Sequence, residues 1–200
     1  MGILDFWSIR MRHIAEACAV FNRPPPSVGK TTVLMQTVDA VKEKGYTAGG
    51  MISREVRKSG TRVGFEILDL RSGRRGWLAH VNQKTGPQVG KYRVNIEDLD
   101  LIGAKAIIDA VEKYDVIAID EIGPMELFSE KFKEATRKAL ERRKLVLAVV
   151  HWKARNTLIS EARNRGDAET TTVTMDNREK LRKILVEEAT RVLKWHDYAF

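Results

Sequence analysis

Cysteine is almost absent from this sequence: Cys18 is the only one, so an internal disulfide is excluded. No apolar run reaches the roughly 18 residues of a membrane-spanning helix. Charge interrupts the first ten residues too early for a signal peptide. Internal repeats, low-complexity segments and Cys/His sets with zinc-ligand spacing are also missing. We therefore expect a cytoplasmic protein without a membrane partner.

What is present is an ordinary globular composition. The 200 residues, of which 43% are hydrophobic and 31% charged, suit one domain with a sizeable core. Met11 could be an alternative start. We therefore expect a variable extension over residues 1–13 and a single domain over residues 14–200.

The segment 23–32 reads Arg-Pro-Pro-Pro-Ser-Val-Gly-Lys-Thr-Thr and nearly fits the phosphate-binding loop G-x-x-x-x-G-K-[ST]. Pro24 replaces the first glycine, and Ser27 stands where a glycine is common. Proline has no N–H, but residues 27–31 keep theirs and can still surround a phosphate chain. The predicted nucleotide-binding residues are Pro24, Pro25, Pro26, Ser27, Val28, Gly29, Lys30, Thr31 and Thr32.

A phosphate loop must follow a strand and begin a helix. Val33, Leu34, Val38 and Val41 recur at helical spacing, and Gly45 provides a stop. The preceding strand is predicted at residues 18–21, although residues 14–17 could equally be helical.

A second segment complements the first. Residues 116–119 form an apolar run typical of a buried parallel strand, and Asp120 and Glu121 follow it. Open α/β sheets bind ligands at the carboxyl ends of their strands. We expect Lys30 to bind the outer phosphates, Thr31 and Asp120 to hold Mg²⁺, and Glu121 to orient the attacking water.

Five motifs, at residues 29–32, 49–57, 60–65, 89–94 and 120–126, carry a family resemblance that covers roughly residues 20–194. In these motifs the chain closely resembles the small THEP-type P-loop nucleoside-triphosphatases first described from thermophiles, which also have a human relative linked to cancer. The resemblance implies a three-layer α/β P-loop domain that hydrolyses ATP, GTP and other nucleoside triphosphates to diphosphate and phosphate with Mg²⁺.

Positive charge concentrates in residues 54–93, which contain ten Lys or Arg and three acidic residues. Short strand patterns and turns predict an antiparallel β-rich insertion over about residues 50–95 of a mostly parallel sheet. Arg54, Arg57 and Arg62 belong to the family-like motifs and are candidate contacts for phosphate or an acidic acceptor. We expect Arg71, Arg74 and Arg75 to lie in a solvated turn.

The remaining elements follow the helix and strand periodicities. Phe128, Phe132, Ala135 and Ala139 predict one face of a helix, and residues 145–150 predict a buried strand. His151 follows that strand and could sense the γ-phosphate or serve structurally. A late strand is predicted at residues 170–174. Asn177 could cap a final helix whose apolar positions include Leu181, Ile184, Leu185 and Val192.

Two other functions fit the same residues. A nucleotide or polynucleotide kinase uses the same phosphate apparatus, with the basic insertion binding the acceptor. A non-hydrolysing nucleotide or nucleic-acid binding module would fit the proline-filled loop and the basic stretch. Arg155 and Arg163 are as plausible as Arg54 or Arg62 as an arginine finger, and a monomer is favoured.

Overall fold

The computed structural model describes residues 18–22, 29–151 and 156–198. Of the segments and residues discussed above, the extension 1–13, residues 14–17, the loop residues 24–28, Arg155 and the side chain of Arg163 lie outside the described residues. Within the described ranges the strands are β1 (Cys18–Asn22), β2 (Ala48–Lys58), β3 (Thr61–Asp69), β4 (Arg75–His80), β5 (Gln88–Val89), β6 (Tyr92–Val94), β7 (Val116–Ile122), β8 (Leu145–Val150) and β9 (Ala168–Thr172).

Helices connect these strands or follow them. They are α2 (Lys30–Glu43), α3 (Ile96–Asp98), the π-helical η1 (Leu99–Ala104), α4 (Lys105–Lys113), the 3-10 turn η2 (Glu126–Phe128), α5 (Glu130–Glu141), α6 (Thr157–Asn164) and α7 (Arg178–Tyr198).

All the described strands belong to one sheet, in the order β5-β6-β4-β3-β2-β7-β8-β1-β9. The pairs β2/β7, β7/β8, β8/β1 and β1/β9 are parallel, whereas the pairs from β2 to β5 are antiparallel. The sheet therefore has a parallel core and an antiparallel extension, as the sequence predicts. The strand β2 belongs to both: Ala48–Ile52 pair with β7, and the rest pairs only with β3.

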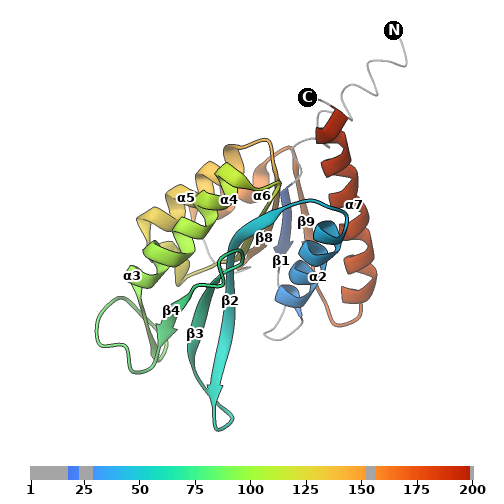
Figure 1. Ribbon diagram of the computed structural model, residues 1–200. Coiled ribbons are helices and arrows are strands. Elements are labelled where there is room, and N and C mark those ends of the chain that lie inside the picture. The colour runs from blue at the N-terminus through green and yellow to red at the C-terminus, as the bar shows by residue number, and fades with distance from the viewer. Residues whose placement is uncertain (1–17, 23–28, 152–155, 199–200) are drawn as a thin grey trace.

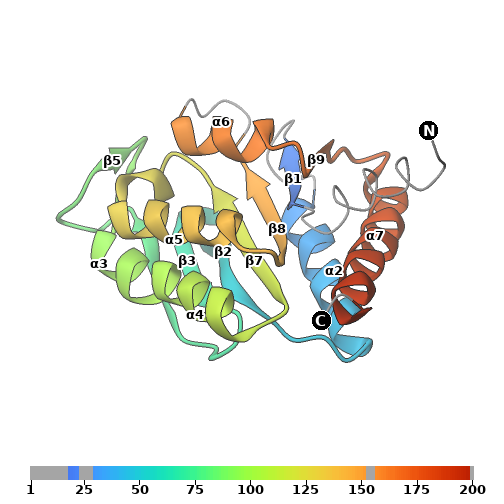
Figure 2. The same ribbon diagram turned by 90° about the horizontal axis from the view of Figure 1, so that it is seen from above.

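Two helical layers cover the sheet, which confirms the three-layer α/β prediction. Figure 2 shows α4, α5 and α6 on one side and α2 and α7 on the other. Each face has its own apolar core. One core packs Phe132, Ile107 and Ile117 together, and the other packs Leu34, Val38 and Leu185 together.

The approach of β2 to β7 depends on Gly50. Its φ is 125°, and a Cβ atom there would lie 2.0 Å from the Ala118 carbonyl oxygen. Only glycine fits that conformation and that space. Gly50 thus allows β2, the first strand of the basic hairpin, to pack closely against β7.

The β2–β3 hairpin projects beyond the helices (Figure 1) and turns at Ser59 and Gly60, whose φ angles are 48° and 78°. This two-residue turn with positive φ matches the right-handed twist of paired strands. The hairpin confirms the predicted β-rich insertion. Arg75 is the first residue of β4 rather than part of the turn, which ends before it.

Four further predictions about elements and their residues need correction. Phe128 is not on the helix with Phe132: it lies in η2 and is 47% exposed, because the Ser129 hydroxyl caps α5 by accepting the Phe132 N–H at 2.9 Å. The late strand occupies residues 168–172 instead of 170–174. Ile184 is exposed while Leu181 and Leu185 are buried, because α7 turns only a narrow stripe toward α2.

The fourth correction concerns Asn177. It directly precedes α7, but its side-chain oxygen accepts the Thr174 N–H at 2.8 Å instead of an N–H of the helix. Its amide donates to the Thr172 carbonyl at 2.8 Å. The side chain therefore closes the turn between β9 and α7.

Candidate nucleotide site

Parallel pairing brings the ends of three strands to one edge of the sheet. Phe21 of β1 and Asp120 of β7 both lie opposite Val149 of β8. The chain enters α2 after β1, reaches Glu121 within β7 and reaches His151 after β8. The first residues of α2 and the predicted carboxylates therefore meet, although they are about 90 residues apart in sequence.

The helix α2 begins at Lys30, directly after Gly29, whose φ is 90°. Val33 N–H donates to the Gly29 carbonyl at 2.9 Å and forms the first turn. The preceding N–H groups have no helical carbonyl, so they are available to an anion. No acidic residue occupies this first turn, so the positive end of the helix dipole is left for a ligand.

Lys30 and Thr31 each contact a carboxylate from β7. Lys30 Nζ lies 3.1 Å from Glu121 Oε2, with 13% and 23% of the two side chains exposed. Thr31 Oγ1 donates to Asp120 Oδ2 at 2.5 Å. The four residues that the sequence singles out for phosphate, metal and water thus form one contiguous cluster.

Asp120 is only 2% exposed. Burial, with the neighbouring negative charge of Glu121, raises its pKa to about 7, against the opposing effects of the Thr31 hydrogen bond and of Lys30. A nearby cation would stabilise the charged form of this buried carboxylate. Its oxygen and the Thr31 hydroxyl are hard donors of the kind that Mg²⁺ prefers, and Mg²⁺ sites are commonly completed by substrate phosphates and water.

The donor set fits that kind of site. In the part of the chain that the structure describes, no group of three or more His, Cys, Asp or Glu side chains could hold a metal by itself. Mg²⁺ requires no such group when it is bound through one or two protein oxygens and a phosphate chain.

Glu126 is a member of the site that the sequence analysis did not assign. It is 4% exposed, and burial together with the charge of Glu121 raises its pKa to about 8. A Cβ atom on Gly123 would lie 3.0 Å from an oxygen of Glu121 and 3.0 Å from one of Glu126, so both carboxyl groups crowd that glycine. Glu126 falls within the motif at residues 120–126, which was the available signal.

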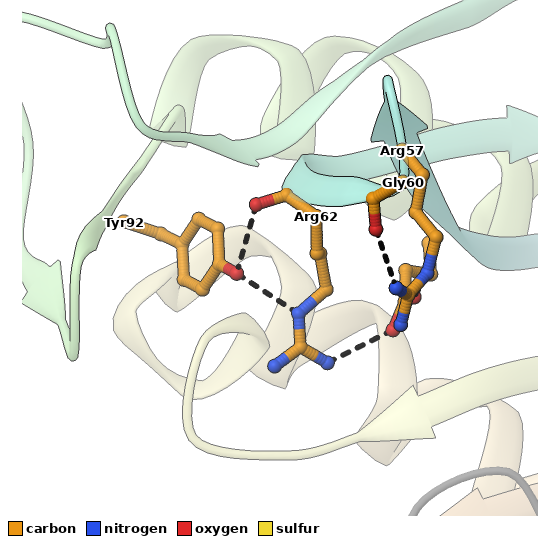
Figure 3. A network of polar contacts seen from close by, with 5 residues as sticks. Arg57, Gly60, Arg62 and Tyr92 are labelled. Carbon is orange, nitrogen blue, oxygen red and sulfur yellow. Dashed lines mark hydrogen bonds and ion pairs between the residues drawn. The ribbon is translucent and has the colours of Figure 1, made fainter.

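The hairpin arginines form a separate network (Figure 3). Arg57 Nε lies 2.5 Å and Arg62 Nη1 2.8 Å from Glu55 oxygens, and Arg62 Nε donates to the Tyr92 hydroxyl at 2.9 Å. The Arg62 guanidinium also lies over the Phe65 ring, with its Cζ atom 5.4 Å from the ring centroid. Tyr92 and Glu55 raise the pKa of Arg62, and the two arginines lower the pKa of Glu55 despite its partial burial.

Arg54 and His151, the remaining residues predicted to contact phosphate or an acceptor, lie at different places in the sheet. Arg54 stands opposite Glu66 in the β2–β3 register. His151 is half-buried, and its backbone N–H donates to the Ile122 carbonyl at 3.0 Å, which ties the end of β8 to the end of β7. His151 therefore lies beside the carboxylate strand, whereas Arg57 and Arg62 are engaged with Glu55.

Comparison with known proteins identifies the family of this chain. The profile of the family described as NTPase matches residues 20–186. The chain belongs to the NTPase family. No helix in the described ranges of this NTPase is long and apolar enough to cross a membrane.

Relatives of this NTPase extend over most of its length. It is 44% identical to the nucleoside-triphosphatase THEP1 of Thermofilum pendens over 164 residues, covering 82% of this chain and 90% of the relative. It is also 44% identical to the protein of the same name from Methanosarcina acetivorans, covering 84% and 94%.

Solved structures share the fold. THEP1 from Aquifex aeolicus superposes with a TM-score of 0.73 at 26% identity, covering 86% of this chain and 97% of the other. The human cancer-related nucleoside triphosphatase superposes with a TM-score of 0.70 at 31% identity, covering 86% and 95%. These findings confirm the resemblance stated from the sequence motifs.

Proposed function

We propose that this protein hydrolyses nucleoside 5'-triphosphates, including ATP and GTP, to the diphosphate and phosphate in a Mg²⁺-dependent reaction. The observation that carries the proposal is the cluster of Lys30 and Thr31 at the start of α2 with Asp120 and Glu121 of β7. Relatives named nucleoside-triphosphatase at 44% identity support it.

Each residue of the cluster has one task. The N–H groups at the start of α2 and the Lys30 ammonium bind the phosphate chain. Thr31 and Asp120 would hold Mg²⁺, which when bound neutralises charge on the outer phosphates. The loop residues 24–28 would continue the phosphate cradle.

Glu121 prepares the water. Its side chain is 23% exposed, so solvent reaches the carboxylate beside Lys30. A water oriented by Glu121 attacks the γ-phosphorus, the bond from that phosphorus to the β–γ bridging oxygen breaks, and the diphosphate leaves. Glu121 accepts the proton of the water as the new P–O bond forms. His151 is proposed near the γ-phosphate because the Ile122 contact places it beside β7.

The arginines of the β2–β3 hairpin have a smaller role in the proposed reaction. Arg57 and Arg62 already pair with Glu55, and Arg54 remains the hairpin arginine proposed to contact phosphate. We also propose a cytoplasmic location, because a chain with one cysteine has no internal disulfide.

Product analysis tests the proposal. Purified protein is incubated with ATP, GTP, CTP and UTP, with Mg²⁺ or with EDTA, and the products are separated by ion-exchange chromatography. We expect nucleoside diphosphate and free phosphate in equal amounts from each substrate, only with Mg²⁺. Phosphate that appears only on an added nucleoside or oligonucleotide acceptor would indicate the kinase, and binding without products would indicate the non-hydrolysing module.

A further inference from the structure

Arg178, the first residue of α7, lies against the start of α2. Its Cδ and Nη1 atoms are 3.8 and 3.9 Å from the position that a Cβ atom would occupy on Gly29. The two helices pack side by side (Figures 1 and 2), with Leu181 and Leu185 of α7 in the same apolar core as Val38 of α2. A guanidinium group therefore adjoins the residue that precedes Lys30.

The turn before α7 fixes Arg178 in that place. Asn177 Oδ1 accepts the Thr174 N–H at 2.8 Å, and Thr174 Oγ1 accepts the Asn177 N–H at 3.2 Å. The N–H of Arg178 itself donates to the Thr174 carbonyl at 3.2 Å. Backbone and side-chain bonds together hold the start of α7, so the backbone of Arg178 is held in place without a ligand.

The charge of Arg178 is not balanced within the described residues. Across those ranges no ion pair joins it to a carboxylate, and its polar contact is Nη1 to the Met175 sulfur at 3.9 Å. The arginines Arg57 and Arg62 differ, because both pair with Glu55. Arg178 also lies beside the first turn of α2, which contains no acidic residue. The guanidinium of Arg178 and the N-terminus of α2 thus adjoin each other, and within the described residues the carboxylates at this place contact Lys30 and Thr31 instead of Arg178.

The direction of approach identifies the phosphate concerned. Glu121 and Asp120 reach Lys30 and Thr31 from β7, so the metal and the terminal phosphate belong on that side. Figure 2 shows α2 between β7 and α7. Arg178 is the first residue of α7 and adjoins Gly29, so it reaches the start of α2 from a different element than the carboxylates do. We infer that Arg178 binds the phosphate nearest the nucleoside, the α-phosphate, and so holds triphosphate and diphosphate alike. This inference rests on the proposed function.

Binding measurements with two nucleotides test the inference. A non-hydrolysable ATP analogue and ADP are titrated into wild-type protein, Arg178→Ala, Arg178→Lys and the control Arg182→Ala. The control removes an arginine one turn further along α7 that pairs with Glu179 at 3.9 Å. Loss of a charge-assisted hydrogen bond should weaken both nucleotides by about 10- to 100-fold in Arg178→Ala. Arg178→Lys should recover part of that affinity, and Arg182→Ala should stay within about 2-fold of wild type.

Kinetics adds a second readout. In Arg178→Ala, KM should rise while kcat changes less than about 3-fold, because the contact is made equally in the ground state and the transition state. Unchanged affinity for both nucleotides would overturn the inference, and so would weakening confined to the ATP analogue, which would place Arg178 at the γ-phosphate. In both cases hydrolysis by wild-type protein would leave the proposed function standing. Absence of binding and hydrolysis in the wild type would overturn both.

Discussion

Replacing Glu121 by Gln should separate nucleotide binding from turnover. In the structure Glu121 holds the Lys30 ammonium at 3.1 Å, and 23% and 13% of the two side chains are exposed. Phosphates must compete with this carboxylate for the same ammonium. A partly buried ion pair of this kind contributes about 1–2 kcal/mol, between the values for exposed pairs and for hydrogen bonds to charged groups. Glu121→Gln removes the competitor, so nucleotide should bind about 5- to 30-fold more tightly.

Turnover should change in the opposite direction. The amide cannot accept the proton of the attacking water, so kcat should fall by about 100-fold or more. Affinity is measured by titration of a fluorescent non-hydrolysable nucleotide, and turnover by phosphate release. Glu66→Gln is the matched control, since Glu66 pairs with Arg75 at 3.3 Å on the hairpin and both parameters should stay unchanged. Weaker nucleotide binding in Glu121→Gln would refute the competition, and an unchanged kcat would remove Glu121 from the chemistry.

Two further predictions concern stability. The pKa of Glu126 is raised from 4.5 to about 8, so the folded state binds a proton that the unfolded state has lost, and stability falls as pH rises between these values. Glu126→Gln should reduce that loss by about 3 kcal/mol between pH 4.5 and 7 in urea unfolding of the metal-free protein, whereas a pH slope equal to that of wild type would contradict the assignment. Gly50→Ala should lower stability by about 2 kcal/mol or more, measured as a fall in Tm of about 4 °C or more, because φ is 125° and the new Cβ would meet the Ala118 carbonyl. The control Gly73→Ala, with φ 72° and open space, should cost less, and equal losses would show that the Ala118 contact does not matter.

The cluster at the sheet edge could be predicted from the sequence because it follows from topology. Strands that run parallel end at the same edge, so a helix that follows β1 begins near carboxylates late in β7. The two motifs therefore predict that Lys30, Thr31, Asp120 and Glu121 lie together. The three-layer arrangement is what the resemblance to the P-loop nucleoside-triphosphatases implies.

Other features depend on contacts that periodicity does not encode. Phe128 continues the helical spacing of Phe132, yet Ser129 begins the helix between them. Asn177 has the residue type of a helix cap, but the backbone of Thr174 competes for its side chain. The place of Arg178 beside Gly29 results from the packing of α7 on α2 and leaves no pattern in the sequence.

The central claim is that the cluster around Lys30 hydrolyses nucleoside triphosphates, and phosphate release tests it most directly. Wild-type protein, Lys30→Ala and the control Lys42→Ala, an exposed lysine near the other end of α2, are compared with ATP and Mg²⁺. We expect steady release by wild type and Lys42→Ala and a loss of about 100-fold or more in Lys30→Ala, because the β/γ-phosphate contact is removed. Equal release by Lys30→Ala, or none by the wild type, would contradict the account.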